Sequence, residues 1–174
     1  MSKYDAYKVA KEFGMMSVGE VGLLKDCAEH LPTAPMVVNI GAGAGTSALA
    51  ILETRRDAFI FSIDKKVVPA ERDVLQKAGL LKDNRVWRLL GDSARVGKHW
   101  PIKLDLCFVD GAHHDSAVIA DIEAWKPLVK DGGFMLFHDY DHPNVPGLTV
   151  IVDDMMADWK RIGSSRYLVA FQNV

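Results

Sequence analysis

The sequence predicts an α/β protein built on a doubly wound, mostly parallel β-sheet with helices on both faces. Short apolar runs alternate with segments of helical periodicity along the chain, and the connections between them are short. A glycine-rich turn follows the first apolar run, Met36–Ile40. Such a run, without polar alternation, is typical of a parallel strand buried on both faces. In sheets of this class, ligands bind beyond the carboxyl ends of the strands, beside the first strand.

The first half of the chain begins with a capped helix. Ser17 and Glu20 form an S-x-x-E capping box, and apolar residues follow at helical spacing up to Leu31. Further elements are then expected in chain order: a strand at Met36–Ile40, a helix from Ser47 to about Thr54, a strand at Ala58–Ile63, and a helix from Pro69 to Gly79.

The second half continues the alternation. A helix with one apolar face runs from Val118 to Val129, and we expect Asp115 or Ser116 to cap it. Strands are expected at Arg85–Leu90, Leu104–Val109, Phe134–Phe137 and Tyr167–Phe171, and a final helix at Leu148–Trp159. This interpretation leaves a short C-terminal end with one strand after the last helix.

Composition narrows the class of protein. The 174 residues contain 21 Lys and Arg against 23 Asp and Glu, a net charge of −2, so no nucleic-acid partner of the strongly basic kind is expected. Hydrophobic residues make up 49% and charged residues 25%, which are ordinary values for a globular protein. No linker or repeat interrupts the chain, so we expect one domain spanning residues 1–174.

Three further observations concern location. Residues 1–11 lack the apolar stretch of a signal peptide. The longest uncharged run, Ala34–Leu52, is interrupted by glycines and hydroxyl residues, so no membrane association is expected. Cys27 and Cys107 lie in apolar surroundings and predict buried thiols in a reducing compartment. Together these features indicate a cytoplasmic protein.

Polar residues gather where the predicted strands end. The glycine loop from Asn39 to Ser47 would let a ligand approach the main chain and the free N–H groups of the next helix, although it is also compatible with a purely structural turn. Asp64, which ends the second strand, is placed to accept hydrogen bonds from ribose hydroxyls, or is a solvated turn residue. Asp92 and Ser93 are placed to contact an adenine edge, or cap the short helix that follows.

The fourth and fifth strands each end in acids and histidines. Asp110 and His113 follow the fourth strand, and Asp139 follows the fifth. Because these strands should be neighbours, the two carboxylates are expected to face each other across one cleft. There they either share a divalent cation, for which the oxygen-rich set favours Mg, Ca or Mn, or repel each other so that one pKa is raised. An imidazole beside a carboxylate is also a simple general base. A polar loop with a few helix caps is the alternative interpretation.

At these residues the chain resembles the class I S-adenosylmethionine-dependent methyltransferases, whose fold is Rossmann-like. The likeness is closest to the group around catechol-type O-methyltransferases, macrocin-type sugar O-methyltransferases and cephalosporin hydroxylase-like proteins. It covers roughly residues 17–156 and lies in these segments: Val38–Ser47, Phe61–Asp64, Gly91–Ser93, Leu104–His113, and Asp121–Asp139 with its G-G-hydrophobic-hydrophobic-H-D ending.

The resemblance implies a role for each matching residue. Gly41, Gly43 and Ser47 would hold the methionine moiety, Asp64 the ribose, and Asp92 and Ser93 the adenine side, while Asp110 would serve the cofactor, the metal and catalysis together. Asp110 and Asp139 stand where metal-dependent members place two ligands, and His113 stands at the position of a basic catalytic residue. Tyr140 replaces a third, amide ligand, for which His138 could substitute, and Asn39 replaces the acid usual in the first motif.

The function implied is transfer of a methyl group from S-adenosylmethionine to a hydroxyl of a small molecule or sugar. A non-catalytic or regulatory nucleoside-binding module is the first alternative, favoured by Asn39 and the short C-terminal end. A nicotinamide-dependent oxidoreductase is the second, but Thr46 stands where the dinucleotide fingerprint has its third glycine. No segment is long enough to form a separate substrate lid, so a homo-oligomer partner is expected to complete the substrate site.

Overall fold

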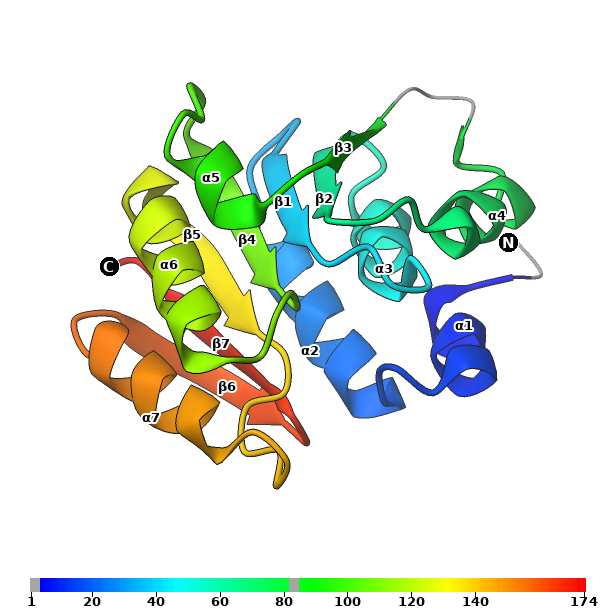
Figure 1. Ribbon diagram of the computed structural model, residues 1–174. Coiled ribbons are helices and arrows are strands. Elements are labelled where there is room, and N and C mark those ends of the chain that lie inside the picture. Colours follow the sequence, from blue (N-terminus) through cyan, green and yellow to red (C-terminus); the bar gives the residue numbers. More distant parts are fainter. Residues whose placement is uncertain (1–3, 82–84) are drawn as a thin grey trace.

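A computed structural model describes residues 4–81 and 85–174, which form one twisted β-sheet between two layers of helices (Figure 1). The strands are β1 (Met36–Ile40), β2 (Phe59–Asp64), β3 (Val86–Leu90), β4 (Leu104–Val109), β5 (Val129–Phe137), β6 (Lys160–Ser165) and β7 (Leu168–Gln172). The helices are α1 (Ala6–Phe13), α2 (Val18–Glu29), α3 (Thr46–Thr54), α4 (Pro69–Lys77), α5 (Ser93–Gly97), α6 (Asp115–Trp125) and α7 (Pro146–Met155), with a short 3₁₀ turn, η2 (Lys126–Leu128).

The sheet has the order β3-β2-β1-β4-β5-β7-β6. Strands β1 to β5 are parallel to their neighbours, and β7 runs antiparallel to both β5 and β6. The chain therefore reverses its winding at β1, between β2 on one side and β4 on the other. This confirms the predicted doubly wound, mostly parallel sheet with helices on both faces.

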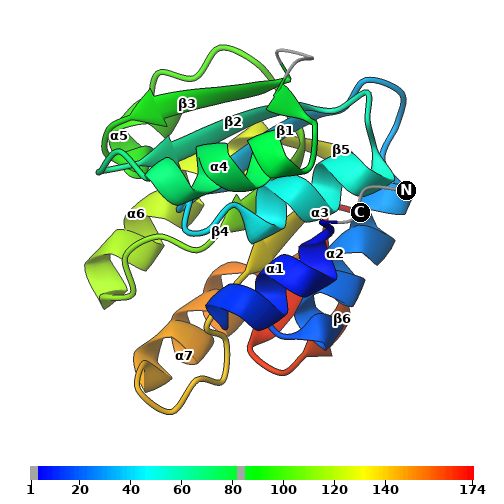
Figure 2. The same cartoon turned by 90° about the vertical axis from the view of Figure 1, so that its right-hand side faces the viewer.

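The alternation of side chains along each strand divides the interior into two cores. In β1, Val37 contributes to the core under α1–α4, whereas Val38 and Ile40 contribute to the core under α5–α7. In β4, Phe108 belongs to the first core and Cys107 to the second. Figures 1 and 2 show the two groups of helices on opposite faces of the sheet.

The C-terminal end differs from the expectation. Two strands follow the last helix, because Lys160–Ser165 forms β6 at the edge of the sheet. Its sequence, KRIGSS, is polar and contains a glycine, so it lacks the apolar run by which the other strands were found. Charged and polar residues are common on edge strands, where they discourage pairing with another chain. The predicted short C-terminal end is therefore wrong.

The N-terminal caps of three helices differ in how well the local sequence predicted them. The capping box of α2 is present, since the Glu20 amide donates to Ser17 Oγ and the Ser17 amide donates to the Glu20 carboxylate. The expected cap of α6 is wrong: His114 is the N-cap residue, and no side chain caps the helix. An unpredicted helix, α1, is capped by Asp5, whose carboxylate accepts from the Lys8 amide.

The parallel strands bring their carboxyl ends to one side of the sheet, and main-chain hydrogen bonds continue into the loops there. The Gly41 amide donates to Ile63 O, and the Asp110 amide donates to Ile40 O, each at 2.9 Å. The His138 amide likewise donates to Val109 O at 3.0 Å. These bonds fix the first residues after β1, β4 and β5, where the glycine loop and the two acid- and histidine-bearing loops begin.

In residues 4–81 and 85–174, no helix combines the length and the apolar character needed to cross a bilayer. The uncharged run Ala34–Leu52 forms β1, the glycine loop and most of α3, as expected.

Candidate functional site

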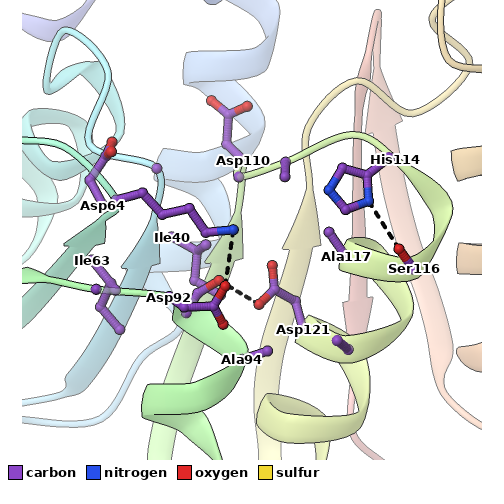
Figure 3. A pocket seen from close by; sticks show the side chains of 17 residues that line it. Ile40, Ile63, Asp64, Asp92, Ala94, Asp110, His114, Ser116, Ala117 and Asp121 are labelled. Atoms are coloured by element: carbon purple, nitrogen blue, oxygen red, sulfur yellow. Dashed lines mark hydrogen bonds and ion pairs between the residues drawn. The ribbon is translucent and has the colours of Figure 1, made fainter.

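A cavity of about 360 Å³ opens at the carboxyl ends of β1, β2, β3 and β4 (Figure 3). Five residues singled out from the sequence line it: Gly41, Asp64, Asp92, Ser93 and Asp110. Its other walls are made mostly of small side chains from the loop after β4 and from α6. The strand-end residues are thus brought together in one place.

The glycine loop lies against the loop that follows β4. Gly41 has φ +86°, and a Cβ at this position would stand 1.9 Å from Asp110 O, so only glycine fits. A second, much smaller cavity lies over this loop and is lined by Gly43, Ser47 and again Asp110, with Met15 from the α1–α2 connection. Asp110 therefore lines both cavities.

Asn39 belongs to a buried chain of hydrogen bonds. Ser47 Oγ donates to Asn39 Oδ1 at 2.8 Å, and Asn39 Nδ2 donates to Ser62 Oγ at 3.0 Å. Ser62 Oγ in turn donates to Glu71 Oε1 at 2.5 Å. A carboxylate at position 39 has no proton to donate to Ser62, so the amide completes a chain that the usual acid would break. Burial, the largest effect, raises the pKa of Glu71.

Asp64 is held by the main chain on both of its oxygens. The Ala42 amide donates to Oδ2 at 3.0 Å and the Lys66 amide to Oδ1 at 2.9 Å. Each oxygen keeps a second lone pair, so the carboxylate can still accept from a ligand in the cavity that it lines. Asp64 also fixes the glycine loop relative to β2, which a solvated turn residue would not do.

Asp92 and Ser93 have partners that separate their roles. Asp92 caps α5 by accepting from the Arg95 amide at 3.0 Å, and its other oxygen lies 2.9 Å from Lys65 Nζ. The capping alternative is therefore the one that the geometry shows for Asp92. Ser93 Oγ instead donates at 2.5 Å to Asp121, a buried carboxylate of α6 (Figure 3).

The acids after β4 and β5 meet as predicted. Asp110, His113 and Asp139 offer ligand atoms that lie within 4.8 Å of one another. His113 Nδ1 lies 3.3 Å from Asp139 Oδ2, and the His113 side chain is 41% exposed. Asp139 has φ +58°, a strained backbone of the kind often found at functional sites.

His138 lies beneath this cluster as a buried partner of three carboxylates. Its Nδ1 is 3.4 Å from both Asp110 and Asp139, and its Nε2 is 3.6 Å from Glu20 Oε1. Burial opposes its protonation, but the three acids outweigh burial and raise the pKa of His138 to about 12.

The same contacts divide the acids. Burial raises the pKa of Asp110 despite His138, whereas His138 holds the pKa of Asp139 below its ordinary value. The pKa of Glu20 falls to about 2, because His138 and Ser17 outweigh the effect of burial.

Two expectations about a third ligand do not match the geometry. Tyr140 points away from the acids, with its hydroxyl donating to Asp153 Oδ1 at 2.8 Å and accepting from Arg161 at 3.2 Å. His138 faces the two carboxylates with one nitrogen and Glu20 with the other, so it acts as their ion-pair partner. His113 is the side chain that the structure adds to the acid pair.

Three residues of the site were not singled out as site residues. Glu20, Glu71 and Asp121 lie on helices. The sequence around each of them is typical of an ordinary cap, surface or helix residue. All three are at most 2% exposed. An acid on the apolar face of a predicted helix is the signal that could have found Asp121, which precedes Ile122 and stands three residues after Val118.

The sequence also matches a known protein family. A model of the family described as "Methyltransferase domain" matches residues 38–140, which include the glycine loop, the large cavity and both acid-bearing strand ends. A search of curated proteins gives no match.

Solved structures with the same fold are numerous, and three illustrate their range. A protein assigned as a caffeoyl-CoA O-methyltransferase from Staphylococcus aureus superposes with a TM-score of 0.73 at 15% identity, over 98% of this chain and 93% of that one. The O-methyltransferase TomG from Streptomyces achromogenes, in complex with SAM, gives 0.71 at 17% identity, over 97% and 88%. A protein assigned as an rRNA-methylase from Clostridium thermocellum gives 0.71 at 12%, over 89% and 97%.

At these identities the structures establish the fold, while the family match establishes the kinship. The fold of all seven strands is that of the class I methyltransferases, which use S-adenosylmethionine as methyl donor. The chain belongs to the methyltransferase-domain family.

Proposed function

We propose that this protein transfers the methyl group of S-adenosylmethionine to a hydroxyl of a small molecule or sugar. The observation that carries the proposal is the place of Asp110, which lines the large cavity, the small cavity over the glycine loop and the acid–histidine cluster. A cofactor in the cavities would thus end beside the groups suited to an alcohol or phenol. Gly41, Gly43, Ser47, Asp64, Asp92, Ser93 and Asp110 are the residues proposed to hold it.

A divalent cation fits the residues present. Asp110 and Asp139 supply carboxylate oxygens on one side of a cleft, and His113 supplies a nitrogen within the same 4.8 Å group. Oxygen-rich sets of this kind suit Mg or Mn. Such a cation, when bound, would lower the pKa of an acceptor hydroxyl and orient it. Asp110 and Asp139 are the proposed ligands.

His113 is proposed as the proton acceptor. Its Nδ1 faces Asp139 at 3.3 Å, an arrangement that fixes the ring and favours a proton on this nitrogen. Nε2 is then the basic nitrogen, on a side chain that is 41% exposed at the mouth of the site. A base that is oriented by a carboxylate and open to incoming substrate can take the hydroxyl proton as the methyl group is transferred.

The proposed acceptor is small, since the net charge of −2 gives no general attraction for RNA. Methyl transfer needs mainly alignment of the sulfonium with the acceptor oxygen, and the loops after β4 and β5 are proposed to supply that alignment. A second copy of the chain completing the acceptor side of the site remains part of the proposal, as does a cytoplasmic location.

Binding of S-adenosylhomocysteine tests the cofactor. At 100 times its dissociation constant the ligand should stabilise the fold by about 2.7 kcal/mol, seen as a higher melting temperature, whereas NADH should leave the curve unmoved. Asp64→Ala should weaken binding about 10- to 100-fold, because ribose hydroxyls lose a charged acceptor. Asp73→Ala, an exposed acid of α4, is the matched control. A shift with NADH alone would overturn the proposal.

Turnover on catechols, other phenols and nucleotide sugars tests the catalytic groups. Asp139→Asn should abolish Mg- or Mn-dependent transfer and leave S-adenosylhomocysteine affinity nearly intact, whereas Asp141→Asn, in the same loop, should change neither the transfer nor the affinity. His113→Ala should lower the rate by about 10²–10⁴, against an unchanged rate for His99→Ala. Full activity after chelation would rule out a role for the cation, and full activity of His113→Ala would rule out His113 as the base.

A further inference from the structure

The carboxylate of Asp121 is a buried polar group in the wall of the large cavity. It belongs to α6 and lines the cavity close to the ends of β3 and β4, and the residue is only 2% exposed. Its Oδ1 accepts from Ser93 Oγ at 2.5 Å. Within residues 4–81 and 85–174, Oδ2 has no hydrogen-bond partner. Figure 3 shows this carboxylate directed from α6 toward the cavity.

Oδ2 is not sealed in the interior: the residue is largely buried, but this oxygen keeps some accessible surface. Burial, the largest effect, raises the pKa of Asp121, against the opposing hydrogen bond from Ser93. A ligand N–H that donates to Oδ2 would stabilise the charged carboxylate. Oδ2 can therefore accept a hydrogen bond from a ligand in the cavity.

Gly111 borders the space beside Oδ2. A Cβ built on Gly111 would stand 3.5 Å from this oxygen, so the absence of a side chain at Gly111 leaves the oxygen open. The neighbouring lining residues are small: Gly91, Ala94, Ala112, Ala117 and Ala120. A planar base can lie between these walls and present one edge to Asp121.

The other acids around the cavity each have a donor or a basic side chain of the protein beside them. Asp92 has one oxygen on the Arg95 amide and the other on Lys65 Nζ. Asp64 holds the glycine loop from the end of β2, and Asp110 faces His138. Asp121 is the acid whose second oxygen is left for the base.

We propose that Asp121 Oδ2 accepts a hydrogen bond from the exocyclic 6-amino group of the cofactor's adenine and thereby selects adenine over a 6-oxo purine. The inference rests on the proposed function, because it assumes an adenosyl cofactor in the large cavity. A 6-oxo purine presents a carbonyl oxygen to the carboxylate, so two acceptors face each other. Sites built to hydrogen-bond one polar group reject analogues that cannot make the bond.

Calorimetry with two ligands tests the selection. S-Adenosylhomocysteine and S-inosylhomocysteine differ in the group at position 6 of the purine and in the proton on N1, and the wild type should prefer the first by about 100-fold. Asp121→Asn keeps the size of the side chain and turns an NH₂ toward the ligand, so the preference should fall to about 1 or reverse. Glu123→Gln, at an exposed position of the same helix and outside the cavity lining, is the matched control and should retain the wild-type ratio.

The outcomes separate the two proposals. A folded Asp121→Asn protein with the wild-type ratio, or a wild type that does not discriminate, overturns the role of Asp121 and leaves the cofactor assignment standing. A wild type that binds neither ligand overturns both. If Asp121→Asn does not fold, NMR of wild type with S-adenosylhomocysteine labelled with ¹⁵N at the 6-amino group decides the question. A nuclear Overhauser effect between the amino protons and the Asp121 β-protons supports the proposal, and its absence in the bound complex overturns it.

Discussion

Gly41 ends the first strand so close to Asp110 that the two main chains leave no room for a Cβ. Its amide donates to Ile63 O, while the Asp110 amide donates to Ile40 O. One residue without a side chain thus lets the loops after β1 and β4 share the same small volume. This contact brings the glycine loop, which is proposed to hold the methionine end of the cofactor, next to Asp110, the proposed catalytic acid.

Substitution of Gly41 by Ala should therefore be far more costly than the backbone strain alone. The Cβ would stand 1.9 Å from Asp110 O, so one of the two main chains must move, and we expect a loss of about 3–5 kcal/mol in the free energy of unfolding. Gly79→Ala is the matched control, since Gly79 has φ +75° with nothing within 4 Å, and should lose only about 1–2 kcal/mol. Urea unfolding of both variants measures the difference. Equal losses would show that the close approach does not matter.

Residues of the site divide into those that sequence position reveals and those that it hides. Asp110 and Asp139 could be predicted because a parallel sheet brings the ends of neighbouring strands together. Asp121 and Glu71 reach the site from helices, and the face that a helix presents to a cavity depends on how it packs. Glu20 was identified as half of a capping box, and its second role depends on a contact with a residue 147 positions away.

At the scale of elements, α2 is connected to the C-terminal strands by one carboxylate. Glu20 Oε1 accepts from the Tyr167 amide at 3.0 Å, in the turn between β6 and β7, and lies 3.6 Å from His138 Nε2. The same side chain closes the capping box with Ser17. A helix of the first layer thereby positions the histidine beneath the acids of β4 and β5.

Removing this carboxylate should cost much more than removing the cap. Glu20→Ala leaves His138 without one of its three acids and the Tyr167 amide without its acceptor, and we expect a loss of about 3–5 kcal/mol. Ser17→Ala, which loses only the cap, should cost about 1 kcal/mol. Thermal melts of the two variants give the comparison. A Glu20→Ala protein no less stable than Ser17→Ala would contradict the linking role.

The elements themselves were largely predictable because alternating apolar runs and helical periodicity mark parallel α/β units. The two that were missed lack those signals. In β6, Ile162 is the single large apolar residue, since an edge strand buries little. In α1 the buried side chains are small or few, Ala6, Val9 and Ala10, and its position depends on contact with α2 and α3.

At the scale of the whole molecule, the two cores each contain one thiol. Cys27 lies in the core under α1–α4 and Cys107 in the core under α5–α7. Burial raises the pKa of Cys27 to about 12 and that of Cys107 well above its ordinary value. Neither sulfur is therefore a reactive thiolate in the folded protein.

Each thiol can report when its own face of the sheet opens. At pH 8 and without denaturant, neither Cys27 nor Cys107 should react with a disulfide reagent such as 5,5′-dithiobis(2-nitrobenzoate), and both should react in guanidinium chloride. Single variants Cys27→Ala and Cys107→Ala assign the two signals. If the fold opens cooperatively, the two rates should rise at the same denaturant concentration. Reaction of one thiol well before the other would show that the two faces open separately.

The position of β7 between β5 and β6 has a consequence for the order of assembly during synthesis. β6 is made first, yet the sheet pairs it only with β7, so it has no place to bind until residues 168–172 have been added. The Tyr167 amide, which donates to Glu20, directly precedes β7 and is therefore also made late. Until that moment β5 is an open edge, and the α2 carboxylate lacks one of its partners. A nascent chain that has already made every proposed cofactor and metal residue must therefore wait for its last strand before the acid–histidine site is held in place.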